Sequence, residues 1–190
     1  MDPFVASLAQ EEAKAMISVM AFMSYNPSIG RALEEGGVEK FQELMVELVP
    51  RMKDLRGRED FDAFHDQCVQ RIISDFKTSK DMVPAYGQAQ KPLNVFLKVF
   101  VDWAGKPDQE TSRRLLPHLH VPLDSVLMRT IRGEYPDWYR ANIRQHVWTP
   151  QQRYSLSKID RVCYDKWQQF FRERHPEKPL LFDVAWAVNR

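Results

Sequence analysis

The residues best suited to chemistry lie between Pro84 and Asp124. This segment opens on a break between two predicted helices, and the glycine that ends the break, Gly87, permits a positive φ and close approach of another backbone. The amide groups of Gly87, Gln88 and Ala89 begin the next helix and can hold an anion such as a phosphate. The alternative is a plain corner between two helices that binds nothing.

Two ionisable side chains in this segment are candidates for reactive groups. Lys91 is an amine nucleophile if burial lowers its pKa, and it is equally suited to a phosphate contact. Asp124 precedes a predicted helix, so its carboxylate is either only an N-cap, worth about 1 kcal/mol, or also a fixed charge that stabilises a developing cation. His118 and His120 suggest a metal site, but no third ligand accompanies them, and we expect neither a metal nor another cofactor.

The net charge of +1 conceals an asymmetry along the chain. Residues 1–75 carry 8 Lys/Arg and 14 Asp/Glu, a net of −6, whereas residues 76–190 carry 19 and 12, a net of +7. A basic C-terminal part suits a polyanionic partner such as a nucleic acid. An ordinary charged surface with a chance imbalance is the alternative.

Several observations narrow the class of protein. Cys68 and Cys163 are far apart, which favours a reducing compartment and argues against a zinc or iron–sulfur site. No apolar run is long enough to cross a bilayer, and residues 1–4 lack the basic region of a signal peptide. We therefore expect a cytoplasmic protein whose 190 residues form one domain, 1–190.

Helical periodicity dominates the chain, and no alternation of β type persists for more than a few residues. The pattern predicts an all-α fold, with a first helix from Pro3 that ends at Asn26-Pro27. Further helices are predicted near residues 38–49, 61–76, 88–100, 111–116, 125–132 and from 136. Thr149 and Gln152 have the form of a capping box and predict one more helix, and residues 179–186 form a short tail.

Two motifs, in this order, resemble those of the helix–hairpin–helix DNA glycosylases. That superfamily has a hairpin of the form Leu-Pro-Gly-Val-Gly, then a helix, then a Val-Pro-x-Asp segment with a catalytic aspartate. Here Pro84 to Gly87 is followed by Val121 to Asp124. The long gap and the position of Lys91 are most similar to the archaeal 8-oxoguanine glycosylase branch, AGOG. Ala85 stands where the first hairpin glycine is usual.

The resemblance implies a two-lobed helical domain, with the hairpin and catalytic segment over residues 82–132, that excises a damaged or modified base from double-stranded DNA. It implies that Asp124 is catalytic and that Lys91 is a second catalytic residue, with lyase activity left open. It places the hairpin residues Gly87, Gln88 and Ala89, with Arg129 and Arg132, against DNA. The residues expected around the flipped base are Tyr86, Asn94, His118, His120, Asp183 and Trp186.

Within this resemblance the substrate and role stay open. One version is the excision of hypermodified (glucosylated hydroxymethyl) cytosine from phage DNA, as a defence in the bacterial cytoplasm or nucleoid. We expect the protein to be a monomer and not to bind a membrane. The alternatives are a non-enzymatic helical adaptor that grips DNA or a protein, and a helical enzyme of another class.

Overall fold

The computed structural model describes residues 2–146 and 155–184, and these form helices and no strand, with one isolated bridge between Leu33 and Thr78. The all-α prediction is therefore confirmed for the described residues. The elements are α1 (Pro3–Ile29), α2 (Gly37–Leu48), η1 (Val49–Asp54), α3 (Arg58–Asp75), α4 (Tyr86–Leu97), the π-helical η2 (Lys98–Trp103), α5 (Gln109–Leu115), η3 (Leu116–His118), α6 (Ser125–Glu134), α7 (Pro136–Asn142), η4 (Leu156–Lys158), α8 (Arg161–Arg174) and η5 (Pro179–Val184).

The helix starts follow local capping chemistry. Asp2 caps α1 by accepting a hydrogen bond from the Phe4 amide at 2.8 Å, and Pro136 opens α7 as its first residue. Asp160 caps α8 through the Cys163 amide at 2.7 Å. The helix predicted from the Thr149 capping box has its start outside the described residues, and the helix that follows begins only at Arg161.

Two prolines lie inside helices. The sequence predicted the end of a helix at the first proline and placed the second near the start of a helix. Asn26-Pro27 does not end α1, which continues to Ile29 and closes with a hydrogen bond from the Gly30 amide to the Tyr25 carbonyl. Pro92 lies in the second turn of α4, because this helix begins at Tyr86 rather than after Gly87. Tertiary packing thus outweighs the hydrogen bond that each proline removes.

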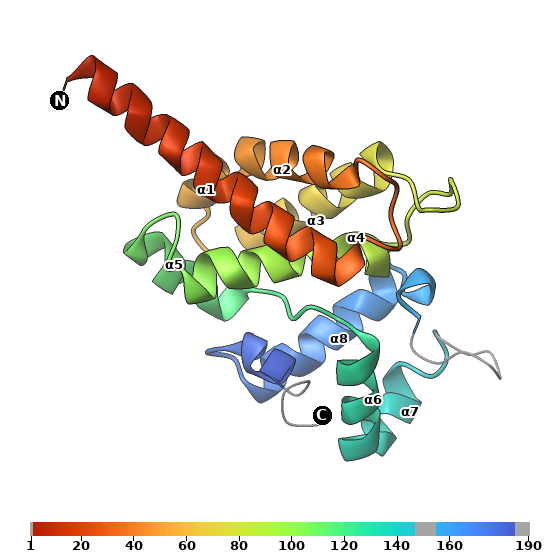
Figure 1. Cartoon of the computed structure of the whole chain (residues 1–190). Helices are drawn as coiled ribbons and strands as arrows, with labels where there is room; N and C mark the ends of the chain where they lie inside the picture. The colour runs from red at the N-terminus through yellow and green to blue at the C-terminus, as the bar shows by residue number, and fades with distance from the viewer. Residues whose placement is uncertain (1, 147–154, 185–190) are drawn as a thin grey trace.

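Helix α4 is the centre of the fold, since α1, α3 and α8 all pack against it (Figure 1). Buried apolar side chains from α1 to η5 form one continuous cluster around it. Near the C-terminal end, α7 and α8 contribute aromatic rings to this cluster, and the indole of Trp167 is fully buried against Phe171 and Tyr139. This central helix carries Lys91, one of the two ionisable residues of the candidate site described below.

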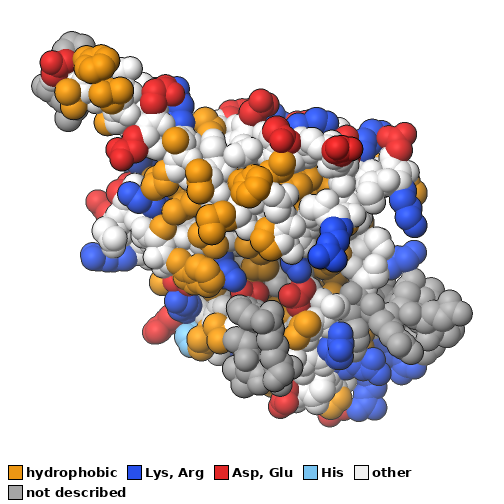
Figure 2. Space-filling model, viewed as in Figure 1, with side chains coloured by type: hydrophobic (Ala, Val, Ile, Leu, Met, Phe, Trp, Pro, Cys, Tyr) orange, Lys and Arg blue, Asp and Glu red, His pale blue; other side chains and the backbone are white. Residues whose placement is uncertain are grey.

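Helix α1 extends beyond the rest of the molecule at its N-terminal end (Figure 1). Its first half is exposed all round, and only its second half packs on α2 and α4. Hydrophobic side chains follow its outer side, as Figure 2 shows. Among the described helices, neither α1 nor any other carries an apolar stretch long enough to span a bilayer.

Candidate active site

The fold brings together the two ionisable residues that the sequence singled out. Lys91 Nζ lies 3.6 Å from Asp124 Oδ2, and the two side chains are 16% and 28% exposed. Both line a cavity of about 660 Å³. An amine and a carboxylate therefore share one wall of a space large enough for a small-molecule ligand, since such sites measure roughly 300–1,000 Å³.

Asp124 is held by its own helix. Its Oδ1 accepts hydrogen bonds from the amides of Val126 at 2.9 Å and Leu127 at 2.8 Å, which start α6. The second oxygen, Oδ2, faces Lys91. The N-cap role expected for Asp124 is thus present, and it fixes the carboxylate while leaving one oxygen toward the cavity.

The segment that leads into Asp124 is clamped by α8. The Val121 amide donates to Gln168 Oε1 at 2.8 Å, and Gln168 Nε2 donates to the Val121 carbonyl at 2.9 Å. Both residues are buried, and the extended stretch from Leu119 to Leu123 packs into the core. Gln168 therefore positions the backbone three residues before the candidate carboxylate.

Three further segments complete the cavity, and sequence reasoning did not find them. The loop between α3 and α4, the first residue of α6 and the segment around η4 supply side chains with hydroxyl and ammonium groups. These polar lining residues are Thr78, Ser79, Lys80, Ser125, Ser155 and Ser157. Their only common signal is clustered serine and threonine, which by itself favours loops and turns.

Gly87 has a packing role instead of the expected phosphate contact. Its amide donates to the Ile159 carbonyl at 2.9 Å, so it is not available to an anion. A Cβ placed on Gly87 would lie 2.4 Å from the Leu156 carbonyl oxygen and 2.7 Å from Ile159 Cβ. The glycine is therefore required by the close approach of η4 to the start of α4.

The next two amides of the hairpin are also engaged, which corrects the expected anion site. The amides of Gln88 and Ala89 both donate to the Ala85 carbonyl, at 2.9 and 3.0 Å. The Gln88 side chain returns to accept from the Ala85 amide at 3.1 Å, and Ala89 is fully buried. The turn therefore closes on itself and on η4. Any DNA contact here would come from the Gln88 side chain at the cavity.

The two arginines expected at DNA lie on α6, the helix that Asp124 starts. Arg129 and Arg132 are both exposed. The Arg132 guanidinium also lies over the ring of Tyr139, 5.6 Å from its centroid. Both arginines therefore lie on the helix that Asp124 starts. Contacts between these side chains and a DNA backbone would be made on the same helix as the candidate carboxylate.

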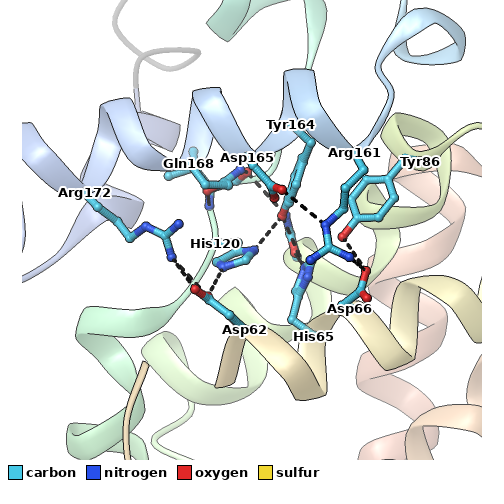
Figure 3. A network of polar contacts seen from close by, with 12 residues as sticks. Asp62, His65, Asp66, Tyr86, His120, Arg161, Tyr164, Asp165, Gln168 and Arg172 are labelled. Atoms are coloured by element: carbon cyan, nitrogen blue, oxygen red, sulfur yellow. Dashed lines mark hydrogen bonds and ion pairs between the residues drawn. The ribbon is translucent and has the colours of Figure 1, made fainter. Parts of the chain in front are cut away.

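Asn94 and His120, both expected around a base, lie instead in a buried polar network, in which Figure 3 labels His120 and its partners. Asn94 is fully buried and donates from Nδ2 to Gln90 Oε1 at 2.7 Å and to Tyr164 Oη at 2.8 Å. His120 is buried between Tyr164 and Asp62. Neither Asn94 nor His120 lines the cavity, so their expected role as base readers is corrected to one of holding α3, α4 and α8 together.

The directions of the hydrogen bonds in this network can be assigned. Burial lowers the pKa of His120, so its ring is neutral; its Nε2–H donates to Asp62 Oδ1 at 2.8 Å and its Nδ1 accepts from the Tyr164 hydroxyl at 2.8 Å. Burial raises the pKa of Tyr164, which keeps that hydroxyl a donor. Burial also lowers the pKa of His65, whose Nε2 lies 2.6 Å from Asn94 Oδ1 and donates to it.

Asp62 terminates the network at the surface. Burial raises the pKa of this carboxyl, but the hydrogen bond from His120 and the charge and hydrogen bonds of Arg172 outweigh burial and hold the pKa at about 2. Arg172 contributes through Nη1, at 3.0 and 3.1 Å from the two carboxylate oxygens. The carboxylate is therefore ionised, which fixes the tautomer of His120.

Tyr86 also belongs to this region and not to the cavity wall. Its hydroxyl donates to Asp66 Oδ1 at 3.2 Å, and burial raises its pKa. The Arg161 guanidinium lies 5.7 Å from the centre of its ring and forms an ion pair with Asp66. The face of Tyr86 is thus occupied, which corrects its expected role as a stacking platform for a base.

Neither His118 nor Asp183 lines the cavity of Lys91 and Asp124. His118 is half-buried at the end of η3, where burial, together with the charge of Arg58, lowers its pKa. Asp183 is buried and accepts from Lys98 Nζ at 2.5 Å, beside a second cavity of about 260 Å³. Burial raises the pKa of Asp183, and the negative charge of Asp124 raises it further. Trp186 lies outside the described residues.

The histidine pair does not form part of a metal site in the described chain. His120 has both ring nitrogens in hydrogen bonds to Asp62 and Tyr164. Across residues 2–146 and 155–184, no three His, Cys, Asp or Glu side chains are grouped so that they could hold a metal ion.

No protein-family model, curated protein or solved structure matches the chain. The functional argument therefore rests on the residues and on the geometry that joins them.

Proposed function

We propose that the chain is a DNA glycosylase that hydrolyses the N-glycosidic bond of a flipped base and leaves an abasic site. The observation that carries this proposal is the Lys91–Asp124 pair, 3.6 Å apart on the wall of a 660 Å³ cavity. An enzyme that acts on a base must take it out of the helix into such a cavity. The two-lobed, glycosylase-like arrangement of helices is part of the same proposal.

Asp124 would stabilise the reacting sugar. Loss of the base builds positive charge on the sugar ring, and a fixed carboxylate lowers the energy of that state. In hydrolysis, water forms a bond to C1′, the C1′–N bond breaks with its electron pair leaving on the base, and Asp124 takes the proton from water. The two amide bonds to Oδ1 hold the carboxylate in place during this step.

Lys91 would serve one of two roles. As an ammonium, it orients Asp124 and contacts the DNA backbone. As an amine nucleophile, it forms a bond from Nζ to C1′, the base leaves with the electron pair of the C1′–N bond, and the proton of the ammonium passes to Asp124. The second role produces a covalent intermediate and lyase activity, so the two roles are separable by experiment.

The cavity favours a large, polar base over an unmodified one. Its volume is in the range of sites that hold drug-sized ligands. Side-chain hydroxyls from Thr78, Ser79 and Ser125 stand on its lining, and those of Ser155 and Ser157 lie on the η4 side. Hydroxyl groups of a sugar adduct would find donors and acceptors there. Glucosylated hydroxymethylcytosine of phage DNA, removed as a defence, fits this description within the proposed function.

Double-stranded DNA would approach over α6. Asp124 starts this helix, and Arg129 and Arg132 are exposed along it. Contacts of arginine with phosphates position a protein on DNA and make binding fall steeply with salt.

The test is alkali-induced strand cleavage of DNA that carries defined modified bases, including phage DNA with glucosylated hydroxymethylcytosine. We expect alkali-labile sites with the unchanged chain and their loss with Asp124→Asn. Asparagine also caps helices, so α6 should survive the substitution. The matched control is Asp160→Asn, which makes the same change at the N-cap of α8, where the aspartate does not line the cavity. No cleavage of any substrate, or full cleavage by Asp124→Asn, refutes the glycosylase.

Borohydride trapping separates the two roles of Lys91. A covalent protein–DNA adduct that Lys91→Gln abolishes establishes the nucleophile. The control is Lys80→Gln, which removes a second lysine from the same cavity. If abasic sites form without an adduct, Lys91 acts by its charge alone.

A non-enzymatic adaptor that grips DNA is the second candidate, and the exposed Arg129 and Arg132 on α6 are the observation that favours it. Salt-sensitive DNA binding without alkali-labile sites on any substrate would support the adaptor over the glycosylase.

A further inference from the structure

Helix α1 is apolar on two opposite sides. On one side Ile17, Ala21, Tyr25 and Ile29 are buried against the rest of the molecule. The other side carries large apolar residues that the described fold leaves 49–69% exposed. These residues are Phe4, Val5, Leu8, Val19, Phe22 and Met23. An exposed apolar surface of this extent marks an interaction site.

The exposed residues form a single stripe. At about 100° per residue, all six lie within an arc of about 100°, together with Glu12 and Ala15. The steps along its centre, from Val5 through Leu8 to Val19 and Phe22, alternate between three and four residues. That spacing is typical of a helix that packs lengthwise against another helix.

The stripe is complementary to itself in one antiparallel register. When two copies of α1 run in opposite directions so that the residue numbers of facing positions add up to 27, every large apolar residue of the stripe faces another. The facing pairs are Phe4 with Met23, Val5 with Phe22, Leu8 with Val19, and Glu12 with Ala15. The one charged residue thus faces the smallest side chain, past which its carboxylate can reach solvent.

We propose that α1 is a dimerisation helix, which pairs antiparallel with α1 of a second copy of this chain through this stripe. The contact is isologous and closes on itself, because each half of the stripe meets the other half in the partner.

The shape of the chain permits this pairing. The first half of α1 extends free of the molecule, and the second half bears the rest of the chain on the side away from the stripe (Figure 1). In the antiparallel pair, the free half of each copy lies along the packed half of the other. Each folded body then lies at its own end, and the stripe between residues 4 and 23 stays separate from the Lys91 cavity, which α1 touches only at Ile29.

The area is sufficient for a dimer. With whole side chains of roughly 150–200 Å² and exposed fractions near 60%, the six residues present about 600 Å² per copy. Stable interfaces bury about 800 Å² per partner, and the backbone and flanking side chains add to the apolar part. A free helix of the length of this first half is marginal in water, so a partner helix would also stabilise it.

A lipid surface is a poorer occupant. Interfacial helices are rich in lysine and arginine on their polar side. From Pro3 to Ile29, α1 has Glu11, Glu12 and a single lysine, Lys14, which pairs with Glu11 at 2.7 Å. The charge of the helix therefore does not attract anionic lipid.

The test is the mass of the full chain in solution, measured by sedimentation equilibrium between about 1 and 100 µM, which covers dissociation constants in the micromolar range. We expect a concentration-dependent dimer. Leu8→Glu and Val19→Lys should each raise the dissociation constant at least ~100-fold by placing a charge in the seam. The double variant should recover most of the affinity, because the introduced glutamate faces the introduced lysine of the second copy.

The control is Val162→Lys on α8. Val162 is 55% exposed, which matches the 57% exposure of Val19 on α1. This variant should dimerise like the unchanged chain. Unchanged helical circular dichroism shows that each variant folds. The proposal is overturned by a monomer at 100 µM, by a dimer that Leu8→Glu leaves intact, or by a double variant as monomeric as its parents. Binding of the monomer to phosphatidylcholine–phosphatidylglycerol vesicles through this stripe would also overturn it.

Discussion

Gly87→Ala distinguishes the packing role of this glycine from a phosphate-binding role. The added Cβ would lie 2.4 Å from the Leu156 carbonyl oxygen and 2.7 Å from Ile159 Cβ. Both neighbours belong to or directly follow η4, so relief requires this segment to move away from α4. Such a movement also breaks the 2.9 Å hydrogen bond from the Gly87 amide to the Ile159 carbonyl.

The magnitude follows from three contributions to the free energy of unfolding. Overpacking a buried position costs about 1–3 kcal/mol. The lost hydrogen bond costs about 1 kcal/mol, and the better helix propensity of alanine returns about 1 kcal/mol. The net destabilisation is therefore about 1–3 kcal/mol, which lowers the melting temperature of a chain of this size by about 2–12 °C.

The assay is urea denaturation monitored by circular dichroism, with salt-dependent DNA binding measured in parallel. Gly133→Ala is the matched control, because a Cβ on Gly133 in α6 meets nothing within 4 Å. It should stabilise the chain by up to about 1 kcal/mol. If Gly87→Ala leaves the urea midpoint unchanged and weakens DNA binding instead, the packing argument is wrong and the hairpin holds phosphate after all.

Three further substitutions or conditions test the site and its supports. Gln168→Leu leaves the Val121 amide without a partner and the Val121 carbonyl with only the bond from Asn94 Nδ2 at 3.3 Å, so we expect about 1–3 kcal/mol of destabilisation in urea and, in a cleavage assay, a lower kcat. The control Gln169→Leu, at an exposed position, should change stability by less than about 0.5 kcal/mol. Burial lowers the pKa of His65 and His120, and unfolding restores values near 6.5, so stability should be complete above that pH and fall below it. Urea midpoints between pH 7.5 and 5.5 measure this fall in the free energy of unfolding, which is at most about 1.4 kcal/mol per pH unit for each histidine. His120→Gln should make the free energy of unfolding depend less steeply on pH. Asp183→Asn removes the negative charge that pairs with the partly buried Lys98 and should cost about 3–5 kcal/mol by thermal melting, whereas Asp137→Asn at the exposed pair with Arg140 should cost at most about 1 kcal/mol.

The helical class and several helix starts are local properties, and the sequence predicts them. Asp124 and Pro136 carry their capping chemistry in the residues that follow, so α6 and α7 begin where the pattern indicates. Pro27 misleads, because packing against distant elements keeps α1 continuous past it, whereas the helix predicted over residues 88–100 runs through Pro92 as α4 does. A local signal cannot weigh that packing.

The candidate site was only partly predictable for the same reason. Lys91 and Asp124 have residue types suited to chemistry, but their separation of 3.6 Å depends on how α4 and α6 meet. Gly87 fits a phosphate-binding turn in sequence, yet its amide is taken by Ile159, far along the chain. Asn94 and His120 have the polarity expected of residues that read a base. Only the folded structure shows that both are buried and that both hydrogen-bond to the Tyr164 hydroxyl.

The buried polar network has a consequence for synthesis on the ribosome. His120 and the Val121 backbone find their partners on Tyr164 and Gln168, which are made last among the helices. Until α8 leaves the exit tunnel, these polar groups must remain hydrated, and unpaired burial would cost about 1–3 kcal/mol for each. The nascent chain should therefore stay loosely packed around α4 and close its core in one late step, when α8 arrives.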